Sequence, residues 1–71
     1  MQRLEVGKLY CVRENPLTIR DRPYETVIIG VIDTSVPFLI LDRKGPYYQV
    51  LYGDKKGWID ILPGNPAKEI R

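Results

Sequence analysis

Few residues of this chain carry the side chains on which catalysis or metal binding usually depends. The 71 residues include no histidine and one cysteine, Cys11, so a disulfide within the chain and the usual zinc ligand sets are excluded. The aspartates are scattered beside expected turns, and Ser35 has no basic partner. Cys11 lies in an apolar stretch and is expected to be a buried, unreactive thiol. We expect a protein that is not an enzyme and has no cofactor or metal.

Aromatic residues offer a different chemistry, which is ring contact with a ligand. Tyr24 follows Pro23 in an expected loop, and Tyr47 comes directly after the Gly-Pro turn at positions 45–46. Together with Trp58 they are candidates for a groove that binds an extended or proline-rich peptide, because aromatic ridges fit such a preformed backbone. The alternative is that Trp58 covers a small barrel and that Tyr24 is a solvated loop residue.

Three consecutive charged residues, Arg20, Asp21 and Arg22, stand at the end of an expected strand. They are candidates for a charge-selective rim beside a bound ligand. The alternative is a solvent-exposed turn with local charge pairing, which contributes little to stability.

Two basic pairs, Arg43-Lys44 and Lys55-Lys56, fall in two expected loops at opposite ends of one strand. Basic loops with aromatic neighbours contact the phosphates of RNA or DNA in small barrels. These four residues therefore define a nucleic-acid alternative for the function. Acidic residues flank both pairs, and the net charge is only +2, so two solvated turns are the competing interpretation.

The elements that must position these side chains are expected to be strands. Eight Ile, six Val and three Thr stand against a single Ala, which favours β-structure over helix. Strands are expected over residues 8–12, 17–20, 27–32, 38–42, 47–52 and 58–60, and residues 61–62 are candidates for closing the sheet. Alternation puts Tyr48, Val50 and Tyr52 on the core side of one strand, with Tyr47 on the other side.

Five to six antiparallel strands spaced about ten residues apart predict an all-β fold, a small barrel. The whole chain, 1–71, is expected to form one domain, with its core over about 8–62 and a loose C-terminal tail over 63–71. No apolar run reaches the ~20 residues that span a membrane. The first residues lack the pattern of a signal peptide, so a cytoplasmic protein without a membrane partner is expected.

The order of these motifs resembles the bacterial SH3 domain family over roughly residues 12–62. The segments that carry the resemblance are LTIRDRP at 17–23, GVI at 30–32, FLILD at 38–42, YYQV at 47–50 and GWI at 57–59. The resemblance implies an SH3-like barrel that acts as a binding module. Known relatives are usually appendages of secreted cell-wall enzymes, which implies peptidoglycan as one possible ligand. The chain departs from the family at residues 33–37 and by having Tyr47 where the family often has Trp.

Two stretches contain more apolar side chains than the interior of one small barrel can bury. Residues 27–32 are apolar on both faces, and Leu39 and Leu41 alternate with Phe38 and Ile40. One set of these side chains must face outward and is a candidate for a partner surface or for self-association.

The expected function is therefore a non-enzymatic SH3-like protein–protein interaction module. Such a module would be a small subunit of a larger assembly, such as a phage structural or host-interaction protein, in the cytoplasm or within a virion. The alternatives are a nucleic-acid-associated barrel and a peptidoglycan- or peptide-binding wall module.

Overall fold

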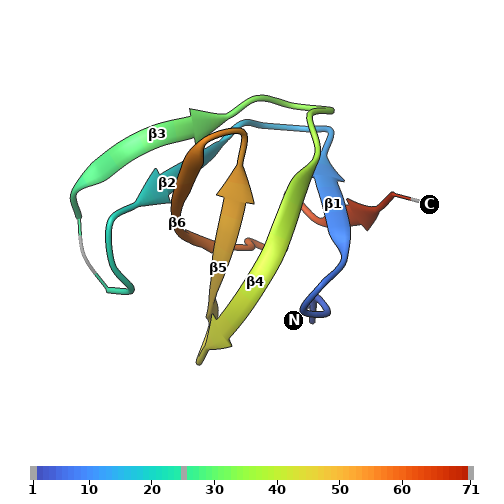
Figure 1. Ribbon diagram of the computed structural model, residues 1–71. Coiled ribbons are helices and arrows are strands. Elements are labelled where there is room, and N and C mark those ends of the chain that lie inside the picture. Colours follow the sequence, from blue (N-terminus) through green and yellow to red (C-terminus); the bar gives the residue numbers. More distant parts are fainter. Residues whose placement is uncertain (1, 25, 71) are drawn as a thin grey trace.

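The fold is an all-β sheet of seven strands, given by a computed structural model that describes residues 2–24 and 26–70. The strands are β1 (Leu9–Val12), β2 (Leu17–Arg20), β3 (Ile28–Ile32), β4 (Phe38–Lys44), β5 (Tyr47–Tyr52), β6 (Lys55–Asp60) and β7 (Ala67–Glu69). They pair antiparallel in the order β3-β2-β6-β5-β4-β1-β7. Figure 1 shows this sheet curled into a half-barrel whose two edges are β3 and β7. The expected small, barrel-like all-β fold is confirmed.

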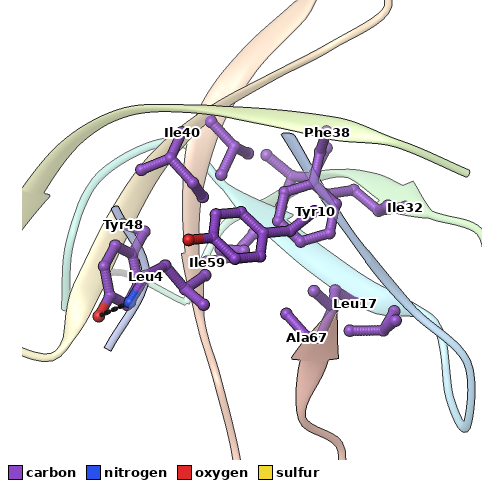
Figure 2. Packing of buried hydrophobic residues seen from close by; sticks show 12 residues of the cluster. Leu4, Tyr10, Leu17, Ile32, Phe38, Ile40, Tyr48, Ile59 and Ala67 are labelled. Atoms are coloured by element: carbon purple, nitrogen blue, oxygen red, sulfur yellow. Dashed lines mark hydrogen bonds between the residues drawn. The ribbon is translucent and has the colours of Figure 1, made fainter. Parts of the chain in front are cut away.

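Side chains alternate between the inside and the outside of the curled sheet, as the period of two requires. In β2, Leu17 and Ile19 are buried while Thr18 between them is exposed. In β5, Tyr48 and Val50 are buried, as expected, whereas Tyr52 is only half-buried and packs against the core from its margin. The inward side chains form one hydrophobic cluster, and Figure 2 draws its buried members.

Two tyrosine hydroxyls in this core hold the N-terminal segment in place. The Leu4 N–H donates a buried hydrogen bond of 3.0 Å to the Tyr48 hydroxyl (Figure 2). The Glu5 N–H donates one of 2.9 Å to the Tyr10 hydroxyl. The two rings therefore fill the core while their hydroxyls accept bonds from the backbone, and the Leu4 N–H would otherwise be buried without a partner. Leu4 is buried with them and closes the end of the core.

Strands β2 and β6 approach each other closely at Gly57. The ladder between these strands contains one pair, Arg20 opposite Trp58. A Cβ atom at Gly57 would lie 2.7 Å from the Arg20 carbonyl oxygen and 3.1 Å from Cδ1 of Ile29. Only a residue without a side chain fits here, so Gly57 lets the β2–β3 hairpin pack onto the rest of the sheet.

The C-terminal segment is ordered, and the expectation of a loose tail over 63–71 is wrong for its central part. Ala67 is buried opposite Val12, where β7 extends the sheet beyond β1. The Gln2 side-chain amide donates to the Ala67 carbonyl at 2.5 Å and accepts from the Ala67 N–H at 2.8 Å. These bonds fix the start of β7, directly after residues 63–66. The prolines and glycine of residues 63–66 had predicted that regular structure ends there. Residues 61–62 lie outside any strand.

The two hairpin turns are shorter than expected, which corrects the position of the basic pairs. The turns consist of Gly45-Pro46 and Gly53-Asp54, and both glycines have a positive φ. Arg43 and Lys44 therefore end β4, and residues 55–56 begin β6, instead of lying in loops. A two-residue turn with glycine is enough to reverse the chain, so the flanking residues join the ladders.

Candidate functional site

Tyr24, Tyr47 and Trp58 lie on the outside of the curled sheet, and this surface is called the aromatic face below. Trp58 stands between the buried residues Gly57 and Ile59, so alternation directs its side chain outward. The side chain is half-buried. Its direct neighbours across the ladders are Arg20 on β2 and Gln49 on β5. Trp58 therefore belongs to the outer surface and does not cover the barrel interior.

Tyr24 and Tyr47 are in ring contact, although they are 23 positions apart. Their ring centroids lie 4.6 Å from each other at an interplanar angle of 68°, an edge-to-face arrangement. Tyr24 is 66% exposed and has a φ of +64°, which for a residue with a side chain costs about 1–3 kcal/mol. A Cβ atom at Gly45 would lie 3.0 Å from the Tyr24 hydroxyl. The loop after β2 thus folds onto the β4–β5 turn and presents one face of the Tyr24 ring to solvent.

Trp58 is a diagonal neighbour of Tyr47 in the β5–β6 ladder. Tyr47 lies opposite Asp60, and Gln49 lies opposite Trp58. Diagonal positions on one face of an antiparallel pair are about 7–8 Å apart, within reach of aromatic side chains. The three residues selected from the sequence therefore share one surface.

Charged residues surround the aromatic face. Lys44 and Asp60 lie on either side of Tyr47 in the ladders. Of the expected charged rim, Arg20 is half-buried and adjoins Trp58. Asp21 and Arg22 are exposed and pair with each other at 4.0 Å. Arg20 is thus part of the aromatic face, whereas the other two match the alternative of local pairing in an exposed turn.

The four basic residues of the nucleic-acid alternative do not form one patch. Arg43 and Lys44 lie opposite the start of β5, and Lys55 and Lys56 lie opposite its end, a separation of about 13 Å along the strand. Within each pair, consecutive residues point to opposite faces of the sheet. Lys55 is exposed, and its aliphatic side chain passes close to Gly30 on β3. The four basic side chains are therefore separated from one another and do not line a continuous path along which a phosphate backbone could bind.

The outward side of β4 contributes to a row of leucines that crosses three strands. Leu39 lies directly between Leu9 on β1 and Leu51 on β5. Leu39 is half-buried, while the other two are exposed. Leu41 lies at a β-bulge between Ile40 and Asp42 and is half-buried. Sequence reasoning selected Leu39 and Leu41 but missed their partners in the row, because the register between strands decides which residues become neighbours.

Strand β3 carries the other apolar surface that the sequence pointed to. Val27, Ile28 and Val31 are 58%, 56% and 47% exposed, while Ile32 is fully buried. The expectation that part of this segment faces outward is confirmed. The physical reason is the place of β3 at the margin of the sheet, where only one neighbouring strand covers it.

The described residues outside these surfaces meet few of the requirements of metal sites, reactive thiols, binding cavities and membrane-spanning helices. Over residues 2–24 and 26–70 no group of three His, Cys, Asp or Glu side chains is arranged to hold a metal ion. Cys11 is buried, as expected. An open hollow of about 320 Å³ lies between the N-terminal segment and the β4–β5 turn, with Arg3, Arg43 and Asp60 among its lining residues. Within the described part of the chain no helix is long and apolar enough to cross a membrane.

Comparisons of the sequence with models of known families, with curated proteins and with solved structures find no match. The class that fold and surface define is a small all-β, barrel-like domain with an aromatic and apolar exterior.

Proposed function

We propose that this protein is a non-enzymatic protein-interaction module with an SH3-like barrel, and that its aromatic face binds an extended segment of a partner protein. The observation that carries the proposal is the contact of Tyr24 with Tyr47 beside Trp58 on one outward surface. Extended and proline-rich segments dock on surfaces of this kind, because flat rings pack against a backbone that loses little entropy on binding.

The polar neighbours of the aromatic face suit a protein ligand. Tyrosine, tryptophan and arginine are the residue types that dominate binding energy at protein interfaces, and Arg20 lies directly beside Trp58. Lys44 and Asp60 flank Tyr47 with opposite charges. A rim of mixed sign selects a ligand by the pattern of its charges and does not select for a polyanion.

The wider role rests on apolar side chains exposed outside the aromatic face. Leu9 and Leu51 of the leucine row and Ile28 and Val31 of β3 are exposed, and exposed apolar patches mark protein–protein interfaces. The proposal therefore includes a role as a small subunit of a larger assembly, such as a phage structural or host-interaction complex. A cytoplasmic or intravirion setting is part of the proposal, and a single reduced cysteine suits it.

A random peptide library displayed on phage tests the proposal with the purified 71-residue chain as bait. We expect the chain to enrich extended peptides, and we expect Tyr47→Ala and Trp58→Ala to lose that enrichment. Tyr47→Phe keeps the ring and should retain it. The matched control is Leu62→Ala, an exposed apolar residue outside the strands. Backbone shift mapping by NMR with an enriched peptide should then mark residues of the aromatic face.

The proposal fails if no peptide is enriched over an empty support. It also fails if the enriched peptides bind Tyr47→Ala and Trp58→Ala as tightly as the natural chain. A shift map confined to other strands would contradict it in the same way.

A further inference from the structure

Strand β3 has backbone hydrogen-bonding groups that no strand within residues 2–24 and 26–70 uses. It pairs with β2 alone and forms one edge of the sheet (Figure 1). The Asp21 N–H donates to the Val27 carbonyl at 3.2 Å, and the next residue, Ile28, lies opposite Arg20. Hydrogen-bonded and non-hydrogen-bonded positions alternate along an antiparallel pair, so the N–H and C=O of Ile28 point away from β2. One further strand can therefore add to this edge.

The side chains of this edge are apolar and carry no charge. Residues 26–32 read TVIIGVI, without a charged residue or a proline, although natural sheets usually protect an exposed edge with such residues. Thr18 and Arg20 alternate with buried residues of β2 and so face outward. Val31 lies opposite Thr18 and Ile28 lies opposite Arg20, because a β-bulge at Ile29 shifts the register. Ile28 and Val31 therefore share the outward face of the edge.

The opposite edge of the sheet is protected in the usual way. Strand β7 has three residues, and two of them are the charged Lys68 and Glu69. A head-to-tail contact between β3 of one molecule and β7 of the next would set an apolar strand against a short charged one. Such head-to-tail contacts would build open filaments, and each filament would still have an unpaired β3 at one end. A contact between two copies of β3 matches length and polarity and leaves no free β3.

We propose that two copies of this chain pair through their β3 strands, antiparallel about a two-fold axis, and form one continuous sheet. The axis passes between Ile29 and Gly30, so that Ile28 of each copy lies opposite Val31 of the second copy. On the outward face, one row of neighbouring side chains then crosses the junction. It runs from Arg20 and Ile28 of one copy to Val31 and Thr18 of the second copy. The two Arg20 side chains lie in different rows, so like charges do not meet, and each exposed aliphatic side chain gains an apolar neighbour.

This pairing goes beyond the proposed peptide binding, and the residues that meet across the junction, Ile28 and Val31, do not belong to the aromatic face, although Arg20 adjoins both surfaces. Tyr47 and Trp58 lie on β5 and β6, whereas the junction lies on β3. Self-association and peptide binding can therefore fail separately, and the variants that test one leave the other intact.

Sedimentation velocity of the full chain over a series of concentrations tests the pairing. We expect a monomer–dimer equilibrium in the natural chain. Val31→Lys should weaken dimerisation by more than about tenfold, because it removes the aliphatic neighbour of Ile28 at both ends of the junction and places there the residue with which natural sheets most often protect an edge strand. Ile28→Pro removes the free N–H yet stays apolar and should weaken it as strongly, because edge strands tolerate proline where the N–H faces outward. The matched control is Leu62→Lys, at a residue 59% exposed and outside every strand, which should dimerise like the natural chain.

A mixed NMR sample of isotope-labelled and unlabelled chains supplies the register. Contacts between Ile28 of one copy and Val31 of the other are expected, and the spectrum of Val31→Lys should remain that of a folded monomer. A natural chain that stays monomeric at millimolar concentration overturns the proposal. So do open-ended oligomers, and so does a dimer that Val31→Lys leaves intact.

Discussion

The side-chain amide of Asn65 pairs with both polar groups of the Asn15 backbone, 50 positions away in the sequence. The Asn15 N–H donates to Oδ1 of Asn65 at 3.2 Å, and Nδ2 of Asn65 donates to the Asn15 carbonyl at 2.8 Å. Asn65 is the one buried polar residue among those described, and its two bonds imitate a step of a β-ladder. They tie the segment before β7 to the turn between β1 and β2.

Asn65→Ala should therefore lower the free energy of unfolding by about 1–3 kcal/mol, because two partly buried hydrogen bonds are lost, each worth about 0.5–1.5 kcal/mol. Urea unfolding followed by tryptophan fluorescence measures the change. Asn15→Ala is the matched control and should have a small effect, since both bonds use the backbone of Asn15. Equal losses in the two variants would contradict this account of Asn65.

A second prediction concerns the tyrosine hydroxyls. Tyr48→Phe leaves the buried Leu4 N–H without its acceptor and should cost about 1–3 kcal/mol of stability. Tyr52→Phe is the matched control, because the Tyr52 hydroxyl accepts only an exposed bond of 3.4 Å from Asp33. Its effect should stay within about 0.5 kcal/mol. Amide hydrogen exchange should speed up at Leu4 in the first variant alone, and unchanged exchange there would refute the assignment.

The close approach of β6 to β2 gives a third prediction. Gly57→Ala places a methyl group against the Arg20 carbonyl oxygen, which cannot rotate away as a side chain could. We expect a loss of about 1–3 kcal/mol, as overpacked positions show. Gly64→Ala is the control, with no atom within 4 Å of its added methyl group and no positive φ. Thermal unfolding of both variants should separate them by several degrees, and equal midpoints would count against a tight crossing at Gly57.

Removal of residues 67–71 tests the contribution of β7. The shortened chain loses the burial of Ala67 and its two bonds with Gln2, and β1 becomes an open edge. Stability should fall by about 2 kcal/mol or more. Lys68→Ser in the full chain is the control, because its exposed side chain leaves the ladder unchanged. A shortened chain as stable as the full one would restore the interpretation of residues 67–71 as a loose tail.

The sequence predicted the strands well because their apolar residues alternate or run together between clear turn signals. The pattern at 47–52 predicted the correct core face for Tyr48, and the run at 27–32 predicted a strand with some apolar side chains facing outward, without indicating which ones. Strand β7 could not be found in this way. Ala67, Lys68 and Glu69 have little β-propensity, and their strand exists because β1 offers a free edge and Gln2 fixes the entry point.

The candidate site was only partly visible in the sequence. The residue types of Tyr24, Tyr47 and Trp58 suggested a common surface, but their adjacency depends on a loop folding back onto the β4–β5 turn. No local pattern encodes such a contact between distant segments. The strand order is equally non-local, so the sequence marked residues 27–32 as apolar without revealing that they form an edge.

The bonds between Gln2 and Ala67 determine how the domain responds to a mechanical load. A pulling force on residues 2 and 70 loads these two hydrogen bonds through β7, together with the 2.9 Å bond that the Ile70 N–H donates to the Leu9 carbonyl. The force then acts on the β1–β7 ladder at the end where Tyr10 pairs with Glu69. The hydrogen bonds of this ladder therefore break one after another from that end. Tension applied at both ends would thus detach β7 first and leave the other six strands to resist afterwards.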